Sequence, residues 1–190
     1  MAESKLPRWK KSLPMIATDA RFLLAPLLFL ALFNTPRMRA IVAIIFVIAS
    51  LTDWLDGYWA RKFQAESNMG KFMDPIADKI LVLVALVVLL QLRRIDPFSL
   101  TIILARDLFI GGLRSVAAAN QVIIAAKPAG KIKTALQMVA IPCMLIDFHL
   151  GSVTTLRLGQ IGIWISVVLS LWSGAQYTLG YYRITRRSAD

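Results

Sequence analysis

The sequence predicts an all-α integral membrane protein with six transmembrane helices. Of the 190 residues 57% are hydrophobic, and the mean hydropathy of +0.64 is high for a soluble protein. Six segments are apolar and long enough to cross the roughly 30 Å hydrocarbon layer, which takes about 20 residues per helix. Several of the breaks between them contain Pro or Gly, which end helices.

The predicted spans cover residues 15–33, 38–60, 74–92, 97–118, 132–149 and 158–180. Each span after the first follows a break, in order NTPRMR, KFQAESNMG, LRRIDP, NQVIIAAKPAGK and HLGSVTTLR. We treat residues 1–190 as a single membrane domain, with an N-terminal segment at 1–14, the helix bundle at 15–180 and a tail at 181–190.

The N-terminal segment is basic and contains one Trp in SKLPRWKK. It either lies along the inner leaflet, where Trp and Lys are favoured, or is an unstructured basic tail that fixes topology. We do not expect a cleaved signal peptide, because the apolar run that follows is long and has no clear small-residue cleavage site.

The chain carries 22 Lys and Arg against 11 Asp and Glu, a net charge of +11. Nucleic acid is not expected as a partner, because the apolar spans leave little room for a soluble basic face and no nucleic-acid-binding motif is present. Anionic lipid headgroups or phosphorylated substrates fit this charge better.

The basic residues also predict the topology. Six spans place both termini on one side, and thirteen Lys and Arg fall on that side against five on the other, so both termini are expected in the cytoplasm. The thirteen are Lys5, Arg8, Lys10, Lys11, Arg61, Lys62, Lys71, Lys127, Lys131, Lys133, Arg183, Arg186 and Arg187. The five are Arg37, Arg39, Arg93, Arg94 and Arg157.

Four aspartates meet where the second and third spans approach each other. Asp53 and Asp56 are three residues apart, Asp74 and Asp78 are four apart, and each pair shares a helix face. The short link makes the two spans antiparallel neighbours, so the carboxylates converge and need cations to hold them. Oxygen ligands select Mg²⁺ or Mn²⁺, and four carboxylates suit a pair of such ions.

Any one of these aspartates alone fits a solvated helix cap. The set does not, because Asp53 and Asp56 are expected at a helix C-terminus, where the macrodipole disfavours anions. The residues around them suit a phosphorylated ligand. Gly57 and Ala60 allow close approach to the backbone, and Arg61 is a planar cation for phosphate.

The run Asp53-x2-Asp56-Gly57-x2-Ala60-Arg61-x8-Gly70-x3-Asp74-x3-Asp78 resembles the signature of the CDP-alcohol phosphotransferase family at every fixed position. The resemblance implies a six-helix membrane enzyme, commonly a homodimer, that moves a phosphoalcohol from a CDP-activated donor to an acceptor hydroxyl and releases CMP. It implies that the four aspartates bind metal, that Asp78 is also the base for the acceptor hydroxyl, and that the CDP group lies against five residues. These are Asp53, Gly57, Ala60, Arg61 and Gly70.

Basic residues later in the chain indicate a second phosphate pocket for the acceptor. Arg106 and Arg114 are eight residues apart in the fourth span, and Lys131 and Lys133 lie at an expected helix start, where backbone N–H groups also favour an anion. The two lysines are alternatively topology determinants and interfacial anchors. Arg106 lies deep in its span and needs a partner, either Asp107 or a substrate.

A second resemblance narrows the acceptor. ARDLFIGGLR and GKIKTALQMVA are similar to blocks of one branch of the family, the bacterial phosphatidylglycerophosphate synthases, which use CDP-diacylglycerol and sn-glycerol 3-phosphate. LPMIATDARFLLAP resembles the opening of that branch, with Thr18 and Arg21 as further candidate site residues, and departs from it at Met15, where Asn is usual. The resemblance implies the bacterial inner membrane, with the active site facing the cytoplasm.

Other functions stay open from the sequence. Within the family, the acceptor is alternatively inositol phosphate, serine or a phospholipid. Outside it, the aspartates suit an intramembrane cation site of a divalent-metal transporter. That alternative gives no reason for Gly57, Ala60, Arg61 and Gly70, and a non-catalytic scaffold gives none for the aspartates.

Overall fold

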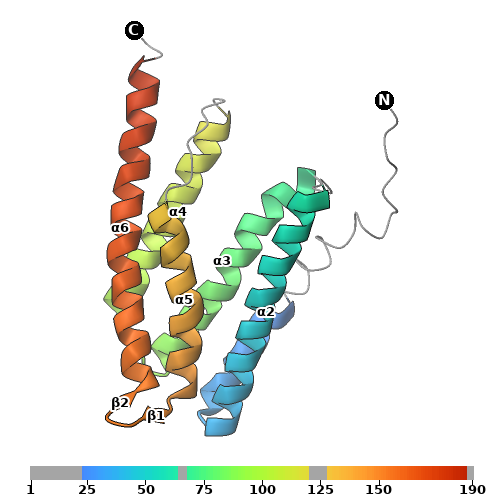
Figure 1. Cartoon of the computed structure of the whole chain (residues 1–190), viewed down its shortest axis with the longest axis vertical. Helices are drawn as coiled ribbons and strands as arrows, with labels where there is room; N and C mark the ends of the chain where they lie inside the picture. The colour runs from blue at the N-terminus through green and yellow to red at the C-terminus, as the bar shows by residue number, and fades with distance from the viewer. Residues whose placement is uncertain (1–22, 64–67, 120–127, 188–190) are drawn as a thin grey trace. The chain divides into compact units, whose positions relative to one another are not determined.

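The computed structural model describes the backbone of residues 23–63, 68–119 and 128–187, and the side chains of 23–52, 79–117, 129–149 and 151–185. The described residues form six helices and one two-stranded hairpin (Figure 1). In order these are η1 (Ala25–Phe33), α2 (Pro36–Phe63), α3 (Asn68–Gln91), α4 (Pro97–Ala119), α5 (Pro128–Ile146), β1 (His149–Leu150), β2 (Val153–Thr154) and α6 (Thr155–Arg187). The predicted helical fold class is confirmed, with the small hairpin as an addition.

The elements group into two compact units, one ending at Leu92 and the other beginning at Arg93. In the first unit, η1 contacts both α2 and α3. The helix η1 is a 3₁₀-helix, whereas residues 15–33 were expected to form a transmembrane α-helix, so this expectation is wrong for the part from Ala25. Buried Ala25, Leu28 and Ala31 recur every three residues, and only a helix with three residues per turn keeps that spacing on one edge.

Helix α2 begins with a proline, whose missing N–H is not needed in the first turn. The hydroxyl of Thr35 accepts a hydrogen bond from the backbone N–H of Met38 at 3.2 Å and caps this end. Further along, the hydroxyls of Ser50 and Thr52 each donate to the carbonyl four residues earlier, both at 2.8 Å. A helix that satisfies its own polar side chains in this way is suited to an apolar environment.

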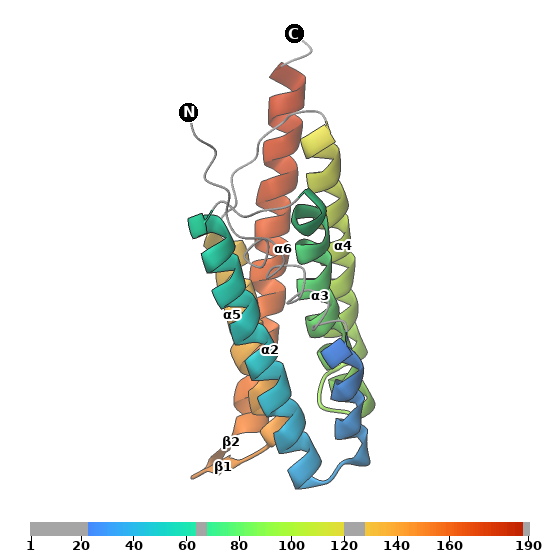
Figure 2. The ribbon, with the colours of Figure 1, turned by 90° about the vertical axis from the view of Figure 1, so that its right-hand side faces the viewer.

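In the second unit, α5 and α6 pack against each other and run antiparallel, and the hairpin connects them at one end (Figures 1 and 2). Small residues let them approach closely. A Cβ at Gly159 would overlap the Met144 side chain and lie 2.7 Å from the carbonyl oxygen of Ala140. A Cβ at Gly162 would lie 3.1 Å from the Cβ of Ala140. Helix α4 packs against α6, so α6 forms the centre of the contacts in this unit.

Helix α6 has polar residues inside and apolar ones outside. Ser166, Ser170 and Ser173 are buried on one face, whereas Val168 and Trp172 are more than 60% exposed. This is the reverse of a helix in a water-soluble protein, and it fits contact with lipid. Among the described residues, Ala129–Ile146 and Thr155–Thr185 are long and apolar enough to cross a membrane. That all six helices do so stays a prediction.

Candidate functional site

The four aspartates predicted to bind metal lie on two consecutive helices. Asp53 and Asp56 are in α2, and Asp74 and Asp78 are in α3. Because α2 continues to Phe63 and α3 already begins at Asn68, both pairs lie within their helices and not at the ends as expected. The helix dipole acts mainly in the terminal turns and therefore contributes less at these positions than the sequence argument assumed.

The chemistry of this donor set fits divalent cations. Four carboxylates supply oxygen ligands and four negative charges, which Mg²⁺ and Mn²⁺ prefer. Their side chains lie outside the described part of the structure. Among the residues whose side chains are described, no group of three or more His, Cys, Asp or Glu is placed to hold a metal ion.

The residues predicted to surround the CDP group belong to the same two helices. Gly57, Ala60 and Arg61 are in the last turns of α2. Gly70 is the third residue of α3, although it was expected in the break before it. Thr18 and Arg21 lie outside the described residues. The contacts of all these side chains remain predictions.

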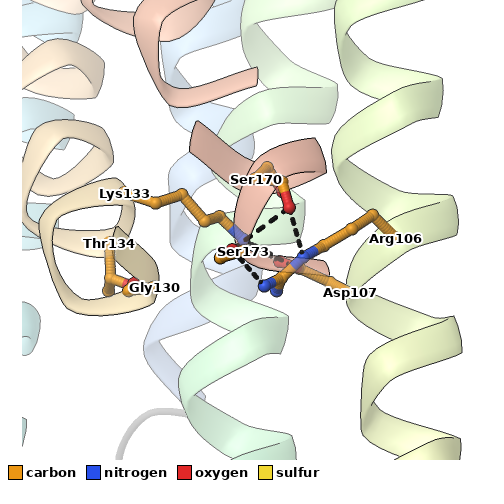
Figure 3. A network of polar contacts seen from close by, with 7 residues as sticks. All are labelled: Arg106, Asp107, Gly130, Lys133, Thr134, Ser170 and Ser173. Carbon is orange, nitrogen blue, oxygen red and sulfur yellow. Dashed lines mark hydrogen bonds and ion pairs between the residues drawn. The ribbon is translucent and has the colours of Figure 1, made fainter. Parts of the chain in front are cut away.

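The predicted acceptor residues are described in more detail, because they lie on α4 and α5. Figure 3 shows the ammonium group of Lys133 and the guanidinium of Arg106 meeting at the carboxylate of Asp107. Lys133 Nζ lies 2.5 and 2.6 Å from the two carboxylate oxygens, and Arg106 Nη1 lies 2.9 Å from Oδ1. We refer to Arg106, Asp107 and Lys133 as the Asp107 network.

Helix α6 completes the surroundings of Arg106. Its Nε donates to the backbone carbonyl of Ser170 at 3.0 Å, and its Nη2 donates to the hydroxyl of Ser173 at 2.7 Å. Gly174 makes room for this side chain, since a Cβ there would lie 3.4 Å from Arg106 Cγ and Nε. The expectation that Arg106 needs a partner within its span is therefore met by Asp107 and by two serines of α6.

The other two predicted acceptor residues lie outside this network. The guanidinium of Arg114 is 5.4 Å from the centre of the Tyr177 ring, a cation–π contact, and the side chain is exposed. Eight residues separate Arg114 from Arg106, which is about 12 Å along the helix axis. Lys131 is exposed on α5. The four cations thus form one pair, in which Lys133 is buried and Arg106 is partly buried, and two exposed residues.

Sequence reasoning named Asp107 only as one of two alternative partners for Arg106, and it missed Ser170 and Ser173. The sequence does contain a pattern that points to the serines, because Ser166, Ser170 and Ser173 recur at helical spacing in an otherwise apolar span. This spacing predicts that they share one helix face, but it does not predict which charged residue contacts that face.

The profile of the family described as CDP-alcohol phosphatidyltransferase matches residues 11–172 of this chain. The chain belongs to this family. The match covers α2 and α3 with their aspartates, the Asp107 network and most of α6, so the resemblance predicted from the Asp53-to-Asp78 run is confirmed. The family is one of integral membrane enzymes, in agreement with the apolar helices α5 and α6.

Curated relatives cover most of the chain. A Bacillus subtilis protein named CDP-diacylglycerol–glycerol-3-phosphate 3-phosphatidyltransferase is 35% identical over 179 residues, which is 87% of this chain and 93% of the relative. A Rickettsia felis protein of the same name is 36% identical over 172 residues, 90% of this chain and 95% of the relative. One from Cereibacter sphaeroides, also of that name, is 37% identical over 141 residues, 71% of this chain and 63% of the relative.

Proposed function

We propose that this chain is a CDP-diacylglycerol–glycerol-3-phosphate 3-phosphatidyltransferase. It transfers the phosphatidyl group of CDP-diacylglycerol to the C1 hydroxyl of sn-glycerol 3-phosphate, giving phosphatidylglycerol phosphate and CMP. The observation that carries this proposal is the shared name of relatives at 35% and 36% identity over 87% and 90% of the chain. The aligned lengths include both the aspartate-bearing helices and the basic residues of the second unit.

The residues that we assign to the lipid donor and its metal ions lie on α2 and α3. In our proposal Asp53, Asp56, Asp74 and Asp78 hold two divalent cations, Mg²⁺ or Mn²⁺. When bound, such a pair neutralises the charge on the β-phosphoryl oxygens and on the departing CMP. Five residues complete the CDP site: Asp53, Gly57, Ala60, Arg61 and Gly70. The glycine and alanine positions leave room beside the backbone, and Arg61 pairs with a phosphate.

Asp78 is the general base in this proposal. The C1 oxygen of glycerol 3-phosphate attacks the β-phosphorus in line with the bond to the α-phosphate oxygen. Asp78 accepts the proton of that hydroxyl, the new P–O bond forms, and the bond to the α-phosphate breaks with release of CMP. A carboxylate suits this role, because it is ionised at neutral pH.

The residues that we assign to the acceptor are basic side chains of α4 and α5. We assign the acceptor's phosphate to Arg106, Arg114, Lys131 and Lys133, with Thr18 and Arg21 as further candidates. Lys133 supplies a buried cation and Arg106 a partly buried one, and both already have fixed partners. Exposed Arg114 and Lys131 supply long-range attraction for a dianion approaching from water.

The setting we propose is a bacterial inner membrane, with six spans and with both termini and the active site on the cytoplasmic side. Support comes from the excess of Lys and Arg on that side in the predicted topology. We also propose a homodimer, in keeping with the family resemblance.

The test is CMP release by the purified, detergent-solubilised chain with CDP-diacylglycerol and Mg²⁺ or Mn²⁺. Glycerol 3-phosphate, serine and inositol phosphate are compared as acceptors, and Asp78→Asn is the inactive control. We expect release only with glycerol 3-phosphate and its loss in the variant. Release with another acceptor would overturn the acceptor assignment, and metal uptake into vesicles without CMP release would favour a transporter.

A further inference from the structure

We propose that Asp107 is a positioning residue that fixes Lys133 and Arg106 as one preformed receptor for the phosphate of the acceptor. The inference rests on the proposed function, because it takes these two cations as part of the acceptor site. It adds a residue to which neither the family signature nor the predicted pocket gives a role.

The charge balance of the Asp107 network supports this role. Side chains of the network are shielded from solvent, with 4% of Lys133, 16% of Arg106 and 19% of Asp107 exposed. Two cations placed together in such surroundings repel each other and lose hydration unless an anion compensates them. Asp107 supplies such an anion to both cations.

The geometry of the Asp107 network fixes both cations. Lys133 Nζ donates hydrogen bonds to the two carboxylate oxygens at 2.5 and 2.6 Å, so two contacts fix the end of this flexible side chain. The guanidinium of Arg106 donates three hydrogen bonds, to Asp107 Oδ1, the Ser170 carbonyl and the Ser173 hydroxyl. Of the five N–H donors of a guanidinium, these contacts use three, which leaves one on each terminal nitrogen for a further acceptor.

Such an arrangement lowers the entropy lost on binding. A lysine side chain without fixed contacts loses rotamer freedom when it binds a ligand. A lysine that is already fixed by hydrogen bonds has lost this freedom before the ligand binds. Asp107 therefore raises affinity for the phosphate without touching the reacting atoms. Its removal should affect the acceptor and not the lipid donor.

The direct test is Asp107→Asn, which keeps the size of the side chain and removes its charge. We expect KM for glycerol 3-phosphate to rise by about tenfold or more, while kcat and KM for CDP-diacylglycerol change by less than about threefold. Asp107→Glu keeps the charge and displaces it by one methylene. It should fold like the parent chain and raise the same KM by several-fold.

A matched control separates positioning from folding. Asp147 pairs with Arg94 at 3.0 Å in the same unit and is not assigned to substrate. Asp147→Asn removes a comparable ion pair, and we expect a lower Tm with KM for glycerol 3-phosphate unchanged. The exchanged pair Asp107→Lys with Lys133→Asp restores opposite charges but moves the ammonium to the other helix. It should recover Tm relative to Asp107→Asn and should not recover KM.

A binding measurement without the lipid donor distinguishes this inference from the proposed function. We expect glycerol 3-phosphate, and not glycerol, to raise Tm of the parent chain and to lose this effect in Asp107→Asn. Equal stabilisation of both chains, an unchanged KM in Asp107→Asn, or recovery of KM by the exchanged pair would each overturn the role of Asp107. The parent chain could be stabilised by glycerol 3-phosphate and yet release no CMP with it. The proposed function would then fail, while the comparison of Tm shifts between the parent chain and Asp107→Asn would still decide the role of Asp107. A parent chain that no phosphate ester stabilises would overturn the inference.

Discussion

Lys131 and Lys133 are two residues apart on α5, and the structure gives them opposite surroundings. Lys133 is buried and bound to Asp107, whereas Lys131 is exposed. Two positions at this spacing lie about 200° apart around a helix and cannot face the same neighbour. The sequence shows two lysines at a helix start, and the fold separates their environments.

We expect this difference to appear when each lysine is replaced by alanine. Lys131→Ala should raise KM for glycerol 3-phosphate more than KM for CDP-diacylglycerol and leave Tm unchanged, because an exposed charge contributes about 0–1 kcal/mol to stability. Lys133→Ala should raise KM for the acceptor further and also lower Tm, because it removes a cation that is bound to both carboxylate oxygens of Asp107. Steady-state kinetics and thermal unfolding of both variants test this. Equal effects of Lys131→Ala on the two KM values would remove Lys131 from the acceptor pocket.

The sequence predicted the helical fold, and it predicted the family from the spacing of Asp53, Asp56, Asp74 and Asp78. Hydropathy identified the approximate position of each helix, because a run of apolar residues is a strong signal. It did not reveal that residues 25–33 form a 3₁₀-helix, since apolar composition does not distinguish three residues per turn from 3.6.

The same limit applies to the acceptor residues. The basic residues could be grouped by their predicted side of the membrane, but their partners depend on how α4, α5 and α6 are rotated about their own axes. That rotation is set by small residues such as Gly159, Gly162 and Gly174, which decide where backbones approach. A single sequence does not show which small residue meets which side chain.

The aspartates on α2 and α3 lead to a prediction for metal removal. With EDTA in excess, CMP release should fall to background, because in our proposal the four carboxylates bind the diphosphate through the cations, and without cations their charges repel it. Mg²⁺ or Mn²⁺ added in excess of the chelator should restore it. Asp56→Asn should need more metal for half-maximal rate.

The control for the metal experiment is Asp147→Asn, which alters a carboxylate in the second unit. Its metal requirement should equal that of the parent chain. Metal-independent CMP release by the parent chain would contradict the assignment of all four ligands.

Close packing of α5 on α6 predicts a strong effect at Gly159. In Gly159→Ala the new methyl group meets Met144 and the carbonyl oxygen of Ala140, so the helices must move apart. Overpacking of this kind costs about 1–3 kcal/mol, which should appear as a lower Tm. Gly180→Ala is the matched control on the same helix, since nothing lies within 4 Å of a Cβ there, and it should be neutral or slightly stabilising. Similar Tm values for the two variants would show that α5 and α6 do not approach at Gly159.

The N-terminus of α4 should give the stability a pH dependence. Asp96 accepts hydrogen bonds from the backbone N–H and the hydroxyl of Ser99, at 2.7 and 2.6 Å. Burial acts to raise the pKa of the Asp96 carboxyl, but these bonds and those from nearby backbone N–H groups outweigh it and lower the pKa. Because the folded pKa is the lower one, the stabilisation is complete above the unfolded value of about 3.9 and is lost as pH falls through the folded value.

The measurement is thermal unfolding of the parent chain and of Asp96→Ala at several pH values. At pH 7 the loss of the helix cap should cost about 1 kcal/mol. The difference in Tm should begin to narrow below about pH 4, where the carboxyl of the unfolded chain takes up a proton, and it should disappear as pH falls through the lower pKa of the folded chain. If the difference in Tm between the two chains stays constant down to about pH 3, the ionised form of the Asp96 carboxyl contributes no more to stability than the protonated form.

Arg93 and Arg94 are adjacent, and only the second is tied to the end of α5. Arg94 is buried, and its guanidinium donates to the carbonyl oxygens of Met144 and Leu145 and pairs with Asp147 at 3.0 Å. These carbonyls belong to the last turn of α5, where no further backbone N–H can reach them. Arg93 is exposed.

Replacing each arginine by glutamine should therefore give different results, although both were counted together as topology determinants. Arg94→Gln leaves the carboxylate of Asp147 without its cation and two helix-end carbonyls without their donor, which should cost about 2–4 kcal/mol and lower Tm by several degrees. Arg93→Gln removes the same formal charge from the same loop and should leave Tm within about one degree, because an exposed charge contributes little. Equal losses in the two variants would place the effect in the charge of the loop and not in the capping of α5.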